Sequence, residues 1–133
     1  ERQDWEFTWQ DMRHFANSLY YCEMLINYAS TLNIDGAAFN KPLIDVVFDD
    51  RPEYGSKFVK WVYLGKDHNQ RLFATNGARL VYNVRELITA INNYLNNPAL
   101  DQLGRMAIVH QQCWRLDGQS GKRIADFIAY QLV

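Results

Sequence analysis

The segment 24–48 constrains the fold of this chain more than any other part of the sequence. A short apolar run, Met24–Asn27, precedes small hydroxyl residues and a helical pattern over Thr31–Asn40. Pro42 ends that pattern, and a second apolar run follows at Leu43–Phe48. Two short apolar runs joined by a helix are typical of parallel strands buried on both faces, which need such a crossover. The segment therefore predicts a strand–helix–strand unit.

The turn inside this unit carries Ser30 and Thr31, where the first strand gives way to the helix. Backbone amides at a helix N-terminus lack intrahelical partners, and the helix dipole is positive there. Such a turn at the carboxyl end of a parallel strand predicts a site for a phosphorylated ligand. The alternative is that both hydroxyls only cap the helix, as Ser and Thr commonly do.

Size and charge exclude several classes of protein. The chain has 133 residues, enough for one domain, and a net charge of −1 with scattered basic residues, which argues against a nucleic-acid partner. No apolar run reaches the roughly 20 residues of a membrane-spanning helix. Cys22 and Cys113 lie far apart without metal-ligand spacing, which indicates reduced cytoplasmic thiols.

The remaining chain reads mainly as helices around one further strand. Asp11 is expected to cap a helix ending near Tyr20, and Asn83 to cap another. The elements expected after the crossover are an ambiguous, slightly helical segment Ser56–Leu64, the strand Arg79–Tyr82, and the helices Val84–Asn96, Ala99–Trp114 and Ser120–Leu132, the last with Ile124, Phe127, Ile128 and Leu132 inward. This order predicts an α/β layered domain with a short parallel sheet and a helical C-terminal tail. Three strands are few, so further strands are expected upstream of Glu1.

Several other polar residues are weaker candidates. His68, expected in a loop before the third strand, could donate to a phosphate oxygen, although single histidines are often incidental. Asp49, Asp50 and Tyr54 follow the second strand and could contact a sugar, a divalent ion or a base; solvated loop residues are the commoner case. The stretch 117–123 lacks the spacing of a nucleotide-binding phosphate loop. Asp117 or Ser120 is instead expected to cap the last helix, with Lys122 and Arg123 near a phosphate.

Several motifs, in this order, resemble the donor-binding half of GT-B glycosyltransferases. They are the Ser30-Thr31 pair, Asp35 in the helix, Asn40-Lys41-Pro42-Leu43-Ile44, Glu86-Leu87 opening a helix, Tyr94-Leu95 with Asn97-Pro98 after it, Arg105, and Asp117-Gly118-Gln119-Ser120-Gly121-Lys122-Arg123. The likeness is closest to bacterial capsule and teichoic-acid families, including the CDP-glycerol glycerophosphotransferases. It covers nearly the whole chain. The basic, often His-Pro-containing element of those families is absent, as is their N-terminal acceptor domain.

The resemblance implies a Rossmann-like three-layer domain, residues 1–133, that binds a nucleotide-diphosphate donor linked to UDP, GDP or CDP. It implies that Ser30 and Thr31 hold the diphosphate and that Asp35 accepts a ribose or sugar hydroxyl. No metal or other cofactor is required, and the general base comes from the acceptor domain, so this piece alone is expected to be inactive. The implied location is cytoplasmic, compatible with peripheral association of the full enzyme with the inner face of the membrane.

Two alternatives stay open. A UDP-sugar 2-epimerase would use the same crossover, but it needs several carboxylates, and the site offers little beyond Asp35. A non-catalytic interaction module would use an aromatic-rich face, with Trp5, Phe7 and Trp9 clustered before the first helix.

Overall fold

The computed structural model describes residues 6–48, 61, 63 and 65–132, and all structural statements below concern these residues. Trp5, Asp49, Asp50, Tyr54, the range 56–60 and residues 62 and 64 lie outside them, so the expectations for those residues stay predictions. The helices and strands are α1 (Trp9–Tyr21), β1 (Leu25–Asn27), α2 (Leu32–Ala38), β2 (Leu43–Val46), α4 (Asp67–Phe73), β3 (Arg79–Val81), α5 (Val84–Asn96), α6 (Gln102–Gln112) and α7 (Ser120–Gln131).

The three strands form a parallel sheet in the order β1-β2-β3, which confirms the predicted α/β class. Leu25 pairs with Leu43 across the first strand pair, and Ile44 pairs with Arg79 across the second. β2 is the middle strand, and its Leu43 and Ile44 have no exposed surface. The apolar run of the sequence is therefore a strand covered on both faces, as parallel sheets require.

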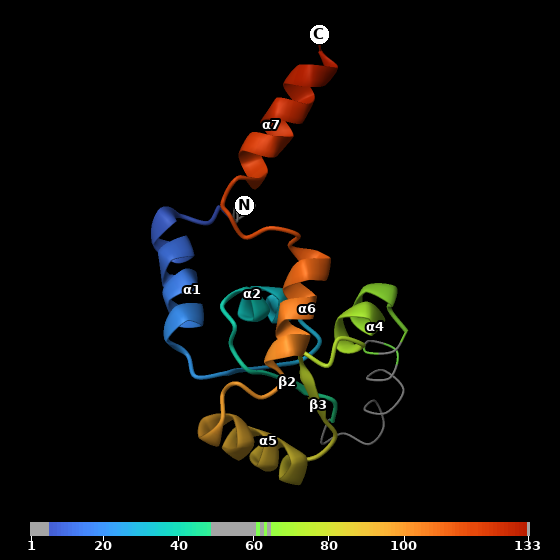
Figure 1. Cartoon of the computed structure of the whole chain (residues 1–133). Helices are drawn as coiled ribbons and strands as arrows, with labels where there is room; N and C mark the ends of the chain where they lie inside the picture. Colours follow the sequence, from blue (N-terminus) through green and yellow to red (C-terminus); the bar gives the residue numbers. More distant parts are fainter. Residues whose placement is uncertain (1–5, 49–60, 62, 64, 133) are drawn as a thin grey trace, which may run out of the picture.

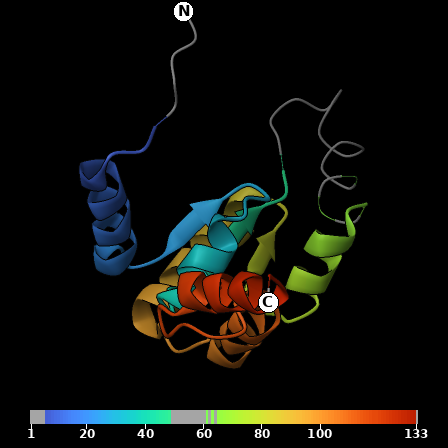
Figure 2. The same ribbon diagram turned by 90° about the horizontal axis from the view of Figure 1, so that it is seen from above.

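Helices cover the sheet on both sides, giving three layers (Figures 1 and 2). On one side, α2 and α6 pack together over a core that contains Ala37, Leu43 and Ile108. On the other side, α5 packs Ala90 and Tyr94 against Ile44 and Val81. The successive residues Leu43 and Ile44 of β2 thus point to opposite cores, as the pleat of a strand dictates.

The cap of α5 is the best match between sequence and structure. Asn83 is the N-cap, and its side-chain oxygen accepts from the Glu86 amide at 3.0 Å. The Glu86 carboxylate in turn accepts from the Tyr82 amide at 2.8 Å. The cap predicted for α1 is wrong: Thr8 occupies the N-cap, and Asp11 completes a capping box from the third helical position. The N-cap of α7 is Gln119 rather than Asp117 or Ser120.

α4 was not expected from the sequence. Its seven residues form a helix where a loop was predicted, and they include His68. Only Leu72 is buried, so the helix lacks the repeated apolar positions that reveal an amphipathic helix. The prediction that His68 lies in a loop is therefore wrong.

The expected orientation of the last helix is also wrong. α7 has no buried residue, and Ile124, Phe127, Ile128 and Leu132 are between 52% and 83% exposed. Figure 1 shows α7 extending away from the sheet and its covering helices. In the same figure α1 stands beside the layers, and only its Leu19 is buried. None of the helices in the described ranges is both long and apolar enough to cross a membrane.

Two glycines allow α6 to touch the turn before β3, and this contact generates a prediction. A Cβ atom on Gly104 would lie 2.5 Å from the carbonyl carbon of Asn76, where no side-chain carbon fits beside backbone. Gly104→Ala should therefore lower the free energy of unfolding by about 2 kcal/mol, despite the better helix propensity of Ala. Urea unfolding measures the change.

Gly121→Ala is the matched control, because that glycine also lies in a helix and has open space around it. It should leave stability unchanged or raise it by up to about 1 kcal/mol. Equal effects of the two substitutions would contradict the close backbone contact.

Candidate functional site

Ser30 and Thr31 lie where β1 leads into α2, at the carboxyl end of the strand, as the sequence predicted. Thr31 is the exposed N-cap residue, and its hydroxyl makes no capping hydrogen bond. Ser30 is half-buried, and its Oγ accepts from the Leu32 amide at 3.2 Å. The alternative that both hydroxyls only cap the helix therefore holds for Ser30, and it does not hold for Thr31.

The amides of this turn are largely occupied by the protein itself. The Ala29 amide is shared between the Asp45 carboxylate at 3.0 Å and the Tyr63 hydroxyl at 2.8 Å. The Ser30 amide donates to the Asn27 side chain at 3.4 Å, and the Asn33 amide donates to the Ser30 carbonyl at 3.1 Å. The expectation of unpartnered amides is therefore wrong for these positions. A ligand at the turn would mainly meet side-chain hydroxyls.

A buried polar cluster, composed of Asn27, Asn33, Asp45 and Tyr63, lies behind the turn. The side-chain Nδ2 of Asn33 donates to Asp45 Oδ2 at 2.9 Å, and the side-chain Nδ2 of Asn27 donates to Asn33 Oδ1 at 2.9 Å. The Tyr63 hydroxyl donates to the Val46 carbonyl at 2.8 Å. Sequence reasoning missed this cluster. Its one local signal is Asp45, an acid in the middle of an otherwise apolar strand.

Burial dominates the electrostatics of the cluster. Asp45 has no exposed surface, and desolvation raises its pKa to about 6, although hydrogen bonds from Asn33 and Ala29 act in the opposite direction. Burial and the adjacent carboxylate also raise the pKa of Tyr63. Asp45 therefore changes its charge close to neutral pH, which is unusual for an aspartate.

The other two predicted site residues, Asp35 and His68, lie on different helices. Asp35 is exposed one helical turn after Thr31, and its charge, after burial, helps raise the pKa of the Cys113 thiol. His68 is exposed in the first turn of α4. No hydrogen bond or ion pair among the described residues joins His68 to Ser30, Thr31 or Asp35. The structure thus places Ser30, Thr31 and Asp35 at the N-terminal end of α2 and His68 on a different helix, α4.

The basic residues near the C-terminus pair with acids on the same segment. Arg123 forms an ion pair with Asp117, which helps lower the pKa of that carboxyl to about 2. Lys122 pairs with Asp126 at 2.6 Å. Within the described ranges, no group of three or more His, Cys, Asp or Glu side chains is arranged to hold a metal ion.

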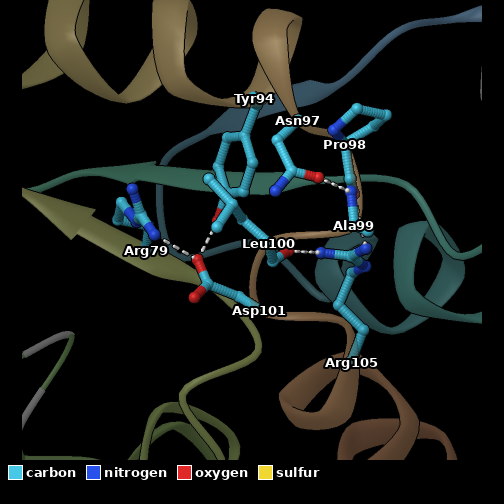
Figure 3. A network of polar contacts seen from close by, with 8 residues as sticks. All are labelled: Arg79, Tyr94, Asn97, Pro98, Ala99, Leu100, Asp101 and Arg105. Carbon is cyan, nitrogen blue, oxygen red and sulfur yellow. Dashed lines mark hydrogen bonds and ion pairs between the residues drawn. The ribbon is translucent and has the colours of Figure 1, made fainter.

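A second polar cluster lies at the opposite, amino end of the strands (Figure 3). The buried Arg105 guanidinium donates to the Pro98 and Leu100 carbonyls and to the Asn40 side chain, at 2.5–3.0 Å. Beside it, Asp101 accepts from Arg79 and from the Tyr94 hydroxyl, each at 2.6 Å. Arg105, part of the family resemblance, thus fastens the connection between α5 and α6.

Comparison with protein families, curated proteins and solved structures finds no match for this chain.

The buried Asp45 predicts how stability changes with pH. Its pKa in the folded protein, about 6, lies above the 3.8 of an exposed aspartate, so the folded state holds the proton more tightly. Its contribution to stability is therefore present at low pH and is lost as pH rises through 6. Relative to Asp45→Asn, the protein should lose about 2.5 kcal/mol of unfolding free energy between pH 4 and pH 7.5.

Urea unfolding of both proteins at the two pH values measures this difference. Other titrating groups are common to both proteins, so their effects cancel in the comparison. A difference between the two proteins that stays constant with pH would contradict the raised pKa of Asp45.

Proposed function

We propose that this chain is the donor-binding domain of a GT-B glycosyltransferase or glycerophosphotransferase that builds a bacterial surface polysaccharide. The observation that carries the proposal is the position of Ser30 and Thr31 at the carboxyl end of β1 in a parallel sheet. Ligands of open α/β sheets bind outside the carboxyl ends of the strands. The order of motifs that resembles these families gives the substrate class.

In this proposal the donor is a sugar or polyol phosphate linked to UDP, GDP or CDP. The free hydroxyl of Thr31, together with Ser30, contacts the diphosphate, since the Ala29 amide is already engaged by Asp45 and Tyr63. Asp35, exposed one turn along α2, accepts a hydrogen bond from a ribose or sugar hydroxyl. His68 would reach the phosphate from α4.

The proposed chemistry is displacement at the anomeric carbon, or at phosphorus if the donor is CDP-glycerol. The domain would bind and orient the donor and stabilise the charge of the departing diphosphate. The base that activates the acceptor hydroxyl would belong to the N-terminal acceptor domain. The domain would work in the cytoplasm, with the full enzyme at the inner face of the membrane.

The exposed apolar side chains of α1 and α7 favour the presence of a second domain or another protein partner that covers them. Trp9 on α1 is 89% exposed, and the apolar face of α7 is open along its length. A soluble domain seldom leaves so many large apolar side chains in water. These faces fit the acceptor domain of the proposal, and they equally favour the second candidate, a non-catalytic interaction module. The described turn residues 28–31 contain no carboxylate to add to Asp35, so a 2-epimerase is the weaker proposal.

Nucleotide-dependent melting tests the proposal. UDP, CDP or GDP at a hundredfold excess over its Kd should stabilise the protein by about 2.7 kcal/mol. Ser30→Ala combined with Thr31→Ala should abolish the shift in melting temperature, measured against the variant's own unliganded value, because the hydroxyls that meet phosphate are gone.

Thr89→Ala combined with Ser18→Ala is the matched control, since both hydroxyl residues are exposed on helices other than α2. The control should retain the full shift. Indifference of the unmodified protein to all three nucleotides would contradict donor binding and favour the interaction module.

A further inference from the structure

The apolar face of α7 is exposed in the described structure. It consists of large side chains at helical spacing, between 52% and 83% exposed: Ile124, Phe127, Ile128 and Leu132. Lys122 and Asp126, which the same spacing puts on the other side of the helix, pair with each other. α7 is therefore an amphipathic helix of the kind that binds in apolar grooves.

A groove between α2 and α6 has the chemistry to receive such a helix. Its volume is about 410 Å³. α2 contributes the small side chains of Ala37 and Ala38 to its lining, and α6 contributes Met106 and Val109. Small residues on one helix leave room for the large side chains of another. Met106 is 58% exposed, so this groove has apolar surface still to bury.

The linker between α6 and α7, residues 113–119, directs α7 away from the groove of its own chain. An ion pair between Arg123 and Asp117 joins the first turn of α7 to the linker, and the Arg123 guanidinium also lies 5.4 Å from the centre of the Trp114 ring. Trp114 in turn lines the groove. Figure 1 shows α7 extending beyond the end of α6. Folding α7 back onto its own chain would break these contacts.

We propose that α7 docks in the α2–α6 groove of a second copy of this chain, and that the two copies exchange their α7 helices reciprocally. Exchange of an identical element is a low-cost route to a symmetric dimer. The inference does not depend on the proposed function, because the groove uses Ala37 and Ala38 at the end of α2, whereas the proposed diphosphate site lies before its start. The exposed face of α1 stays available to another domain.

The area that the exchange would bury is large enough for a specific dimer. With more than half of their surface exposed, the side chains of the α7 face would bury roughly 400 Å² in one docking. The groove would lose a similar area, and the docking occurs twice, which gives about 1,600 Å² in total, the standard size of a specific interface. The described residues that line the groove include no Lys, Arg, Asp or Glu, so docking desolvates none of these charges.

Complementation between two variants of the full chain tests the exchange. Met106→Glu puts a charge in the groove and leaves α7 intact, whereas Phe127→Glu puts a charge on the apolar face of α7 and leaves the groove intact. Sedimentation velocity over a concentration series should show a dimer for the unmodified chain and a monomer for each variant alone. An equimolar mixture of the variants should associate again through one docking, with a Kd about a hundredfold higher than that of the unmodified dimer.

The matched controls carry the same charge on the same helices, away from the two docking surfaces. Leu103→Glu is on α6 at a residue that is 82% exposed and does not line the groove, and Ala129→Glu is on the side of α7 opposite its apolar face. Both should remain dimeric. Ile124→Glu should act as Phe127→Glu does, and thermal melting checks that each variant is folded.

Three results would overturn the inference. A monomeric unmodified chain would mean that α7 is not covered by a second copy. A Met106→Glu variant that stays dimeric would mean that α7 docks on another surface, such as α7 of the second copy. A mixture of Met106→Glu and Phe127→Glu that associates no more than either variant alone would mean that the groove and α7 do not bind each other.

Discussion

The burial of β2 is the constraint on which the rest of the structure depends. The strand pairs on both edges and is covered on both faces, so every backbone group and side chain in it must find a partner inside the protein. Leu43 and Ile44 meet this condition by packing into opposite cores. Asp45 meets it by hydrogen bonds to α2 and to the turn after β1. The position of that turn thus follows from one polar residue in the central strand.

Local signals in the sequence were sufficient to predict most of the helices and strands. The crossover, the three strands and α5 with its Asn83 cap follow from apolar spacing and from capping residues that act within a few positions. α4 was not predicted because a seven-residue helix with one buried side chain shows no repeat of apolar residues at helical spacing. For α7 the apolar spacing correctly marked one face of a helix. It could not say what covers that face, because coverage depends on surfaces that the helix itself does not encode.

The candidate site was predictable in position and not in detail. The placement of Ser30 and Thr31 follows from chain order alone. The state of the amides beside them does not, because their partners come from far along the chain: Asp45 and Tyr63 lie 16 and 34 positions from Ala29. The first amides of α2 are not left without partners, because the Leu32 amide donates to Ser30 Oγ and the Asn33 amide donates to the Ser30 carbonyl. The acid in the middle of the predicted strand Leu43–Phe48 was the available clue.

Arg105 forms hydrogen bonds at the amino end of the sheet that do not change with pH. A guanidinium stays protonated throughout the pH range in which proteins are folded, so its bonds to Pro98, Leu100 and Asn40 do not change with acidity. The amino end of the strands is thereby fixed, whereas the carboxyl end rests on a group that titrates near neutrality. The two ends of the strands therefore differ chemically: the amino end carries a charge that does not change with pH, and the carboxyl end carries an aspartate whose pKa is raised by burial.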